Sequence, residues 1–220
     1  MKGLYFMKLR ILAAVIAVAS ALVFTACKST PTGDKTARNG DSLYKEQKYT
    51  EALESYFTAQ ERGLNIYKEE KLYDGIADCY CQMGEYEKSI AYYKMSLEIE
   101  PANFEAWVNL GVAYRKTGDR DKAVESYEKA LKYDPENNAS VPLYTSLGSV
   151  YIELDKPMSA INYLEKAREF YPEKADIHAY LAIAYKMSFE YAKSEESLAK
   201  AKELHYPKID AIQEQLAKLD

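Results

Sequence analysis

Apolar and small residues recur with a period of 34 positions through the middle of the chain. The copy at residues 104–137 shows the pattern most clearly, with Trp107, Leu110, Gly111, Tyr114, Ala123, Tyr127, Ala130 and Pro135. Apolar residues three and four positions apart indicate a helix with one buried face, and the final proline stops helix continuation. Each copy therefore predicts two helices, joined here by a turn at Gly118-Asp119.

The same spacing returns on both sides of this copy. Residues 70–103 and 141–174 keep it closely, the second after an insertion at 138–140, and both carry the proline, as Pro101 and Pro172. Two looser copies follow the same offsets at residues 36–66 and 175–206, and divergence at the two ends is typical of capping units. After Pro207, the segment 207–220 predicts a capping helix on the apolar positions Ile209, Ile212, Leu216 and Leu219.

This spacing resembles the tetratricopeptide repeat. The resemblance implies an all-α fold, a right-handed α-solenoid of about five helix–turn–helix units plus a C-terminal capping helix, whose curved surface binds another protein. The small residues Gly111 and Gly148 are expected where the two helices of a unit cross closely. The stripe of Tyr and Leu residues is consistent with an aromatic ligand cage or with core packing, and its helical spacing favours core packing.

A different pattern precedes the repeats. Lys2, Lys8 and Arg10 are followed by residues 11–24, which are apolar except for Ser20. A basic region before a short apolar run is typical of a secretory signal, and the run is shorter than the about 20 residues that span a bilayer. The tetrad at residues 24–27, Phe-Thr-Ala-Cys, resembles a bacterial lipobox, with Phe where Leu is usual.

The lipobox resemblance implies a signal peptide at residues 1–26 and a lipid anchor on the sulfur of Cys27. Residues 27–35 then form the lipidated cysteine and a short polar tether. A plain signal peptide with Cys27 as a chance neighbour, or an uncleaved anchor, remains an alternative.

The net negative charge of the chain limits the kinds of molecule that it can bind. The chain has a net charge of −5 and a pI near 5.3, and without residues 1–26, which hold three basic and no acidic residues, the charge becomes −8. A nucleic-acid backbone requires a basic surface, so we expect no nucleic-acid partner. Adsorption to anionic lipid is disfavoured for the same reason, so membrane attachment would depend on the acyl chains.

The sequence offers little for catalysis. It contains no Gly-rich phosphate loop and no His-Glu-x-x-His motif, and Cys79 and Cys81 have no second pair with which to hold a metal. We expect both cysteines to be thiols, Cys79 buried and Cys81 partly exposed. His178 occupies the offset of Trp107 and is expected to pack rather than act as a base. We therefore predict no enzyme activity, no metal or cofactor and no small-molecule substrate.

The resemblance also implies which side chains line the concave groove, because in this family the first helix of each unit lines it at fixed offsets. Carried over by offset, they are Asp41, Tyr44, Lys71, Asp74, Asp78, Val108, Val112, Arg115, Lys116, Thr145, Ser149, Ile152, Ile183 and Lys186. Chaperone-binding members hold a C-terminal carboxylate with positive charge where Asp74 and Asp78 stand, so we expect no carboxylate clamp.

Within the groove set, Asp41, Asp74 and Asp78 predict an acidic N-terminal half. Val108, Val112, Ile152 and Ile183 predict an apolar strip further along. A protein or peptide ligand with Lys or Arg at one end and bulky apolar residues at the other would fit. A merely solvated surface is the alternative.

The combined interpretation is a lipid-anchored scaffold of the bacterial cell envelope, outside the cytoplasm, that holds a protein segment in its groove. It would face the periplasm or the outer surface. Two alternatives are a surface-exposed adhesin that binds a host factor, and an accessory subunit of a cell-wall or secretion complex.

Overall fold

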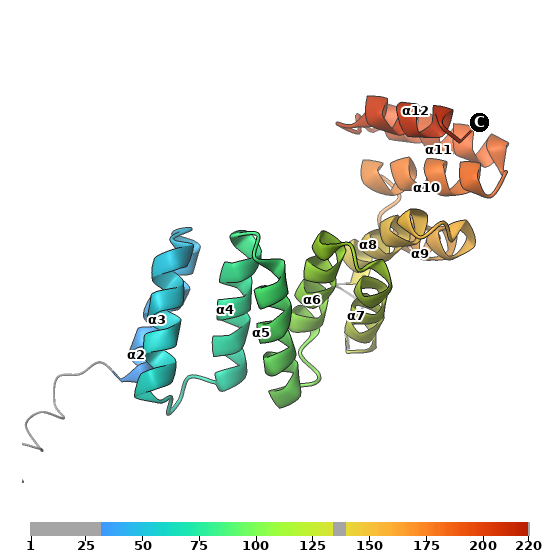
Figure 1. Ribbon diagram of the computed structural model, residues 1–220. Coiled ribbons are helices and arrows are strands. Elements are labelled where there is room, and N and C mark those ends of the chain that lie inside the picture. Colours follow the sequence, from blue (N-terminus) through green and yellow to red (C-terminus); the bar gives the residue numbers. More distant parts are fainter. Residues whose placement is uncertain (1–31, 134–139, 220) are drawn as a thin grey trace, which may run out of the picture.

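The computed structural model describes residues 32–133 and 140–219 of the chain (Figure 1). These residues form eleven α-helices and contain no strand. The helices are α2 (Gly33–Lys45), α3 (Tyr49–Arg62), α4 (Glu69–Gln82), α5 (Tyr86–Ile99), α6 (Phe104–Thr117), α7 (Arg120–Lys132), α8 (Ser140–Glu153), α9 (Pro157–Phe170), α10 (Ala175–Met187), α11 (Tyr191–Glu203) and α12 (Ile209–Ala217).

Ten of these helices pair as helix hairpins, which we call units 1 to 5: α2–α3, α4–α5, α6–α7, α8–α9 and α10–α11. Each unit packs on the next, and α12 covers α10 at the C-terminal end. The predicted α-solenoid with a capping helix is confirmed.

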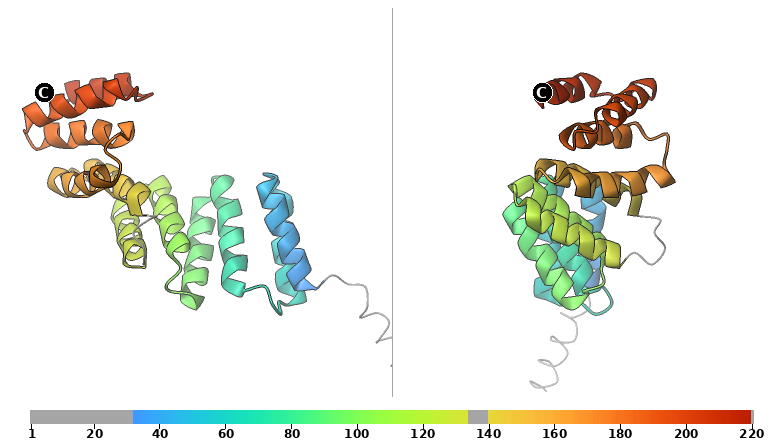
Figure 2. Two further views of the ribbon diagram at one scale, coloured as in Figure 1. Left: turned by 180° about the vertical axis from the view of Figure 1, so that it is seen from behind. Right: turned by 90° about the vertical axis from the view of Figure 1, so that its right-hand side faces the viewer.

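The stack changes direction between units 3 and 4. In Figure 1, helices α2 to α7 stand upright side by side, whereas α9 to α12 lie across the view at the upper right. Figure 2 shows the same change from behind and from the side. Equivalent positions in the two halves of the chain therefore meet different neighbours, which matters for the groove.

The turn inside each unit depends on one residue with a positive φ, the left-handed conformation in which only glycine avoids a steric cost. In order along the chain these residues are Gln47 (61°), Gly84 (79°), Gly118 (85°), Asp155 (55°) and Phe189 (64°). The turn predicted at Gly118 is confirmed.

The close crossing predicted at Gly111 and Gly148 is present. A Cβ atom on Gly111 would lie 2.5 Å from the ring of Tyr127, and one on Gly148 would lie 2.4 Å from Cγ of Leu164. Both distances are far below van der Waals contact, so only glycine allows the two helices of these units to pack at this separation.

Three hydrophobic clusters follow one another along the solenoid, as expected when each unit buries its apolar face on the next. Tyr56, Tyr93 and Tyr127 share one offset on the second helices and are almost completely buried. The predicted stripe of aromatic and Leu residues therefore belongs largely to the core. Ile212 and Leu216 of α12 are buried in the last cluster and close the C-terminal end.

The first helix begins earlier than predicted. Residues 33–35, which the sequence placed in the tether 27–35, form the first turn of α2. A Cβ atom on Gly33 would lie 2.0 Å from the carbonyl oxygen of Gly63, so this end of α2 packs directly on the backbone after α3. The tether interpretation is wrong for these three residues, because they belong to a helix in which Gly33 and Asp34 are buried.

Asp34 explains why this first turn is fixed. Its carboxylate accepts hydrogen bonds from the backbone N–H groups of Asn65 (2.8 Å), Ile66 (3.1 Å) and Tyr67 (3.0 Å) in the loop between units 1 and 2. These donors, with Asn65 and Tyr67 foremost, hold the pKa of Asp34 below its usual value. The predicted signal peptide at residues 1–26, the predicted lipid-anchor residue Cys27 and residues 28–31 lie outside the described residues.

Candidate binding surface on the first helices

Two aspartates lie one turn apart on α4 and face the first helix of the next unit. Asp74 accepts a hydrogen bond from Nδ2 of Asn103 at 2.8 Å. Asp78 accepts one from Nδ2 of Asn109 at 3.2 Å and another from the hydroxyl of Tyr93. The donors are all uncharged, so hydrogen bonds hold both carboxylates in place without neutralising them.

Burial and mutual repulsion act on this pair. Burial, followed by the charge of Asp74, raises the pKa of Asp78 to about 6, and burial raises the pKa of Asp74 as well. Within the described part of the chain neither carboxylate forms an ion pair. Oδ1 of Asp74 is buried near the hydroxyl of Ser96, in a geometry that does not form a hydrogen bond. The pair therefore lacks a cationic partner.

A hollow of about 350 Å³ opens beside this pair. Its walls come from α4 with its N-cap residue, from the turn between α5 and α6 and from the first turn of α6, and carboxylates outnumber lysines among them. The lining residues are Lys68, Glu70, Lys71, Asp74, Gly75, Asp78, Glu100, Asn103 and Glu105. Lys68 already pairs with Glu70 at 3.2 Å. We call this site the acidic hollow.

Asp41 of α2 lies outside the acidic hollow but continues the acidic surface. It accepts hydrogen bonds from the hydroxyls of Tyr56 (2.9 Å) and Tyr67 (2.7 Å). Burial raises the pKa of Tyr67, and the hydrogen bond to Asp41 and the charges of Asp41 and Asp74 raise it further, so both aspartates act on this tyrosine. The expected acidic half thus extends from α2 to the start of α6.

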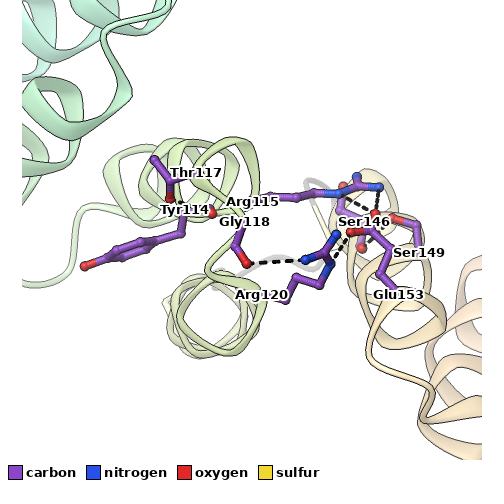
Figure 3. A network of polar contacts seen from close by, with 8 residues as sticks. All are labelled: Tyr114, Arg115, Thr117, Gly118, Arg120, Ser146, Ser149 and Glu153. Atoms are coloured by element: carbon purple, nitrogen blue, oxygen red, sulfur yellow. Dashed lines mark hydrogen bonds and ion pairs between the residues drawn. The ribbon is translucent and has the colours of Figure 1, made fainter.

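An ion-pair network connects units 3 and 4 (Figure 3). The carboxylate of Glu153 on α8 accepts hydrogen bonds from Nε of Arg120 at 2.8 Å and from Nε of Arg115 at 3.0 Å. A terminal guanidinium nitrogen of Arg115 forms an ion pair with the same carboxylate. Arg115, a predicted groove residue, is therefore already paired with a carboxylate of unit 4. Lys116, next to it, is exposed.

Arg115, Thr145 and Ser149 together line a second hollow, of about 270 Å³, which we call the hydroxyl-lined hollow. The other lining residues are Pro142, Ser146, Lys174, Asp176 and Tyr180. Thr145 and Ser149 are only 7% and 4% exposed, and Ser149 donates its hydroxyl to the carbonyl of Ser146 at 2.8 Å. This part of the groove is polar.

The predicted apolar strip is wrong in its C-terminal half. Ile152 and Ile183 are 9% and 1% exposed and belong to the last core cluster. Helix α10 packs against α8, so the offset that faces outward in unit 3 faces another helix here. Val108 and Val112 are half-buried and remain the apolar part of the surface.

Lys186 and Tyr44 lie at opposite ends of the predicted groove. Nζ of Lys186 lies 4.9 Å from the ring centroid of Tyr191, and Lys186 lines a separate hollow with residues of α11 and α12. Tyr44 packs on Tyr49 with ring centroids 5.6 Å apart, and the charge of Asp78 contributes to its raised pKa, after burial. Tyr44 is therefore close to the acidic hollow and Lys186 is not part of it.

Sequence reasoning missed three residues that organise the acidic surface: Tyr67, Asn103 and Asn109. Asn103 had a visible signal, because it precedes a helix and its Oδ1 accepts from the backbone N–H of Ala106 at 3.1 Å, the usual role of an N-cap. Asn109 lies in the interior of a helix, where asparagine is unfavourable because it prefers caps and turns. Tyr67 lies in a loop between units and had no comparable signal.

The chemically reactive side chains are where the sequence placed them. Cys79 is buried and Cys81 half-buried, both are thiols, and burial raises the pKa of each. His178 is buried, and its Nε2 lies 2.5 Å from the carbonyl oxygen of Pro172. Trp107 makes the equivalent contact, donating Nε1–H to the carbonyl of Pro101 at 2.9 Å. His178 is thus a packing substitute for tryptophan.

The described residues hold no group of three or more His, Cys, Asp or Glu side chains arranged to bind a metal ion. Residues 32–133 and 140–219 also contain no helix with the length and apolarity needed to span a bilayer.

Comparison with known proteins agrees with the fold and the repeat. Residues 104–137 and 141–174 each match a tetratricopeptide repeat model, and residues 77–118 match a further model described as a TPR repeat. The first two matches have the limits predicted for units 3 and 4. Residues 77–137 and 141–174 therefore carry tetratricopeptide repeats, and these repeats support a role as a protein–protein interaction scaffold.

Curated relatives align with only part of the chain. Hsp70-Hsp90 organizing protein 1 of Glycine max is 31% identical over 104 residues, which is 47% of this chain and 18% of the relative. BBSome complex member BBS4 of Bos taurus is 28% identical over 131 residues, 60% of this chain and 24% of the relative. The chain thus matches less than a quarter of each relative.

Solved structures show the same fold at low identity. MamA superposes with a TM-score of 0.68 at 19% identity, covering 78% of this chain and 96% of MamA. A tetratricopeptide repeat protein from Parabacteroides merdae superposes with a TM-score of 0.73 at 20% identity, covering 85% of this chain and 72% of that chain.

Proposed function

We propose that the chain is a lipid-anchored scaffold that captures a segment of another protein by placing a basic side chain of that segment in the acidic hollow. The observation that carries this proposal is the Asp74–Asp78 pair. Asp74 and Asp78 are half-buried, their pKa values are raised and they have no cationic partner among the described residues, so their ionisation costs free energy that a lysine or arginine from a partner would offset.

The surface around the acidic hollow indicates which side chains should follow the basic residue in the ligand. Val108 and Val112, half-buried on α6, would accept aliphatic side chains next to the basic residue. The hydroxyl-lined hollow further along favours a polar continuation of the segment. A C-terminal carboxylate would be repelled by Asp74 and Asp78, so the mode of binding differs from a carboxylate clamp.

Localisation rests on the N-terminal sequence. We propose that residues 1–26 are a signal peptide and that Cys27 carries the lipid, which would hold the scaffold on a bacterial membrane outside the cytoplasm. Two experiments would detect the alternative functions, a surface-exposed adhesin and an accessory subunit of a cell-wall or secretion complex. An adhesin would be cleaved by protease added to whole cells, and an accessory subunit would increase the activity of an enzyme that copurifies with it.

A photocrosslinking experiment in cells tests the partner. A photoreactive amino acid is placed at Lys71 or Glu105, both exposed at the edge of the acidic hollow, and at Glu196, exposed on α11, as the matched control. We expect one protein to be captured from positions 71 and 105 but not from 196. Capture should fall in the chain carrying Asp74→Asn with Asp78→Asn. Equal capture from position 196, or capture unchanged by the double substitution, would contradict the proposal.

A further inference from the structure

The loop between units 1 and 2, residues 63–68, is held against the first turn of α2. The carboxylate of Asp34 accepts three successive backbone N–H groups of this loop, and both of its oxygens lie 3.1 Å from the nitrogen of Ile66. Figure 1 shows the start of α2 and the loop from α3 to α4 at the same end of the solenoid. The hydrogen bonds fix the position of the loop relative to the start of α2.

Ile66 points away from the core at this position. Its side chain is 77% exposed, the largest exposed fraction among the large apolar side chains that the structure describes. Turning it inward would break the hydrogen bonds of its own N–H to Asp34. An apolar medium that covered this side chain would therefore contribute free energy that the core does not supply. Single exposed apolar residues are common on protein surfaces, so the surroundings of Ile66 decide what covers it.

The proposed lipid anchor indicates which medium this is. Cys27 precedes Gly33 by six residues. A chain spans at most about 3.6 Å per residue, so the acylated cysteine lies within roughly 20–25 Å of the first turn of α2. A Cβ atom on Gly33 would lie 2.0 Å from the carbonyl oxygen of Gly63, so the loop begins beside this same turn. Ile66 is therefore within reach of the bilayer that would hold the acyl chains.

The charge at this end of the solenoid permits contact with lipid head groups. Residues 33–39 and 61–70 hold four basic and four acidic side chains: Lys35, Arg38, Arg62 and Lys68, and Asp34, Glu61, Glu69 and Glu70. Asp34 and Glu70 are buried, so basic side chains outnumber acidic ones among the exposed residues there. The net charge of −8 on the chain after residue 26 therefore lies on other parts, and head groups would not repel this end.

We infer that the N-terminal end of the solenoid rests on the bilayer, with the side chain of Ile66 inserted among the lipid head groups. This inference rests on the proposed function, because the anchor at Cys27 brings the loop to the membrane. Insertion of one isoleucine is a small contribution by itself, and attachment through Cys27 makes it effective by raising the local concentration of lipid. The contact would fix the orientation of the solenoid, which attachment at a single residue does not.

Photocrosslinking to lipid tests this contact in cells. A diazirine amino acid is placed at position 66 and, as the matched control, at position 46, where Glu46 is exposed at the other end of α2. Mass spectrometry detects phospholipid adducts and, in the same sample, the acyl chains on Cys27. We expect phospholipid adducts from position 66 and none above background from position 46.

The outcomes separate this inference from the anchor. An acylated chain with no phospholipid adduct at position 66, or with equal adducts at position 46, would overturn the inference and leave the anchor standing. An unacylated Cys27 would overturn both. Capture of a protein instead of lipid from position 66 would assign the loop to a protein partner and also overturn the inference.

A second measurement uses substitutions of Ile66, which is exposed and makes no core contact that folding requires. The purified acylated chain is placed in phosphatidylcholine nanodiscs with a spin-labelled lipid, and paramagnetic relaxation of the Tyr67 backbone amide reports docking. Ile66→Asp should lower the ratio of docked to undocked chain by about 10-fold or more, and the control Ile66→Val by about 4-fold or less. Equal relaxation in Ile66→Asp and the native chain would overturn the inference.

Discussion

The hydroxyl of Tyr93, on the second helix of unit 2, donates a hydrogen bond to the carboxylate of Asp78 on the first helix. Tyr93 is almost completely buried, so the bond reaches from the core to the binding surface. Of the contacts that act on Asp78, those of Tyr93 and Asn109 lower its pKa, while burial and the neighbouring Asp74 raise it. The ionisation of the binding surface thus depends on the packing of the unit.

Replacing the donor tests this connection. Tyr93→Phe should raise the pKa of Asp78 above its present value of about 6, because a hydrogen bond to the charged form is lost. The free energy of unfolding at neutral pH should fall by about 1–3 kcal/mol. Carboxyl ¹³C titration and urea unfolding measure the two effects. Tyr92→Phe is the control, and an equal pKa change in that variant would contradict the assignment.

The raised pKa of Asp78 also predicts how stability depends on pH. The unfolded value is 3.8 and the folded value about 6, so the protonated form favours folding. Its contribution is fully present below about pH 4 and is lost as pH rises through about 6. The free energy of unfolding of the wild type minus that of Asp78→Asn should be larger at pH 4.5 than at pH 7.5 by about 1–3 kcal/mol. Urea unfolding at both pH values measures it, and a constant or reversed difference would rule out the raised pKa.

Packing at the helix crossing gives a prediction about stability alone. Gly111→Leu and Gly148→Leu should each lower the free energy of unfolding by about 1–3 kcal/mol or more, because the new side chain meets Tyr127 or Leu164. Lys116→Leu, on the exposed side of α6, is the matched control and should change it by less than about 0.5 kcal/mol. Unchanged thermal midpoints for both glycine variants would show that these helices do not cross there.

The lipid anchor is tested on Cys27. Mass spectrometry of the native protein should find a mature N-terminus at Cys27 with acyl chains attached. Cys27→Ser should remain in the aqueous phase of a detergent partition or keep its signal peptide. An unacylated N-terminus, or one at another residue, would remove the membrane role while leaving the solenoid unchanged.

The fold was largely predictable because each unit repeats the same steric requirements. Gly111 and Gly148 mark the helix crossing, Pro101 and Pro172 mark helix ends, and these restrictions act within one unit. Their consequences can therefore be read from local spacing. Divergence at Phe189, which adopts a positive φ in place of glycine, did not change the turn.

The candidate site was less predictable because it depends on contacts between units. Val112 and Ile183 share one offset, yet the first is half-buried on the surface and the second is 1% exposed, because the stack changes direction between them. The role of Asp34 likewise depends on a contact between units, because its carboxylate accepts hydrogen bonds from the loop between units 1 and 2. A repeat offset specifies the position within a unit, whereas the path of the solenoid decides what covers that position.

The most direct test of the acidic hollow uses the side-chain amide ¹H–¹⁵N signals of Asn103 and Asn109, which donate to Asp74 and Asp78. Blocked Lys-Leu-Leu and Glu-Leu-Leu peptides serve as probes at low and moderate salt. We expect Lys-Leu-Leu to shift both signals, added salt to weaken the effect, and Asp74→Asn with Asp78→Asn to remove it. No shift with Lys-Leu-Leu, or an equal shift with Glu-Leu-Leu, would contradict this expectation.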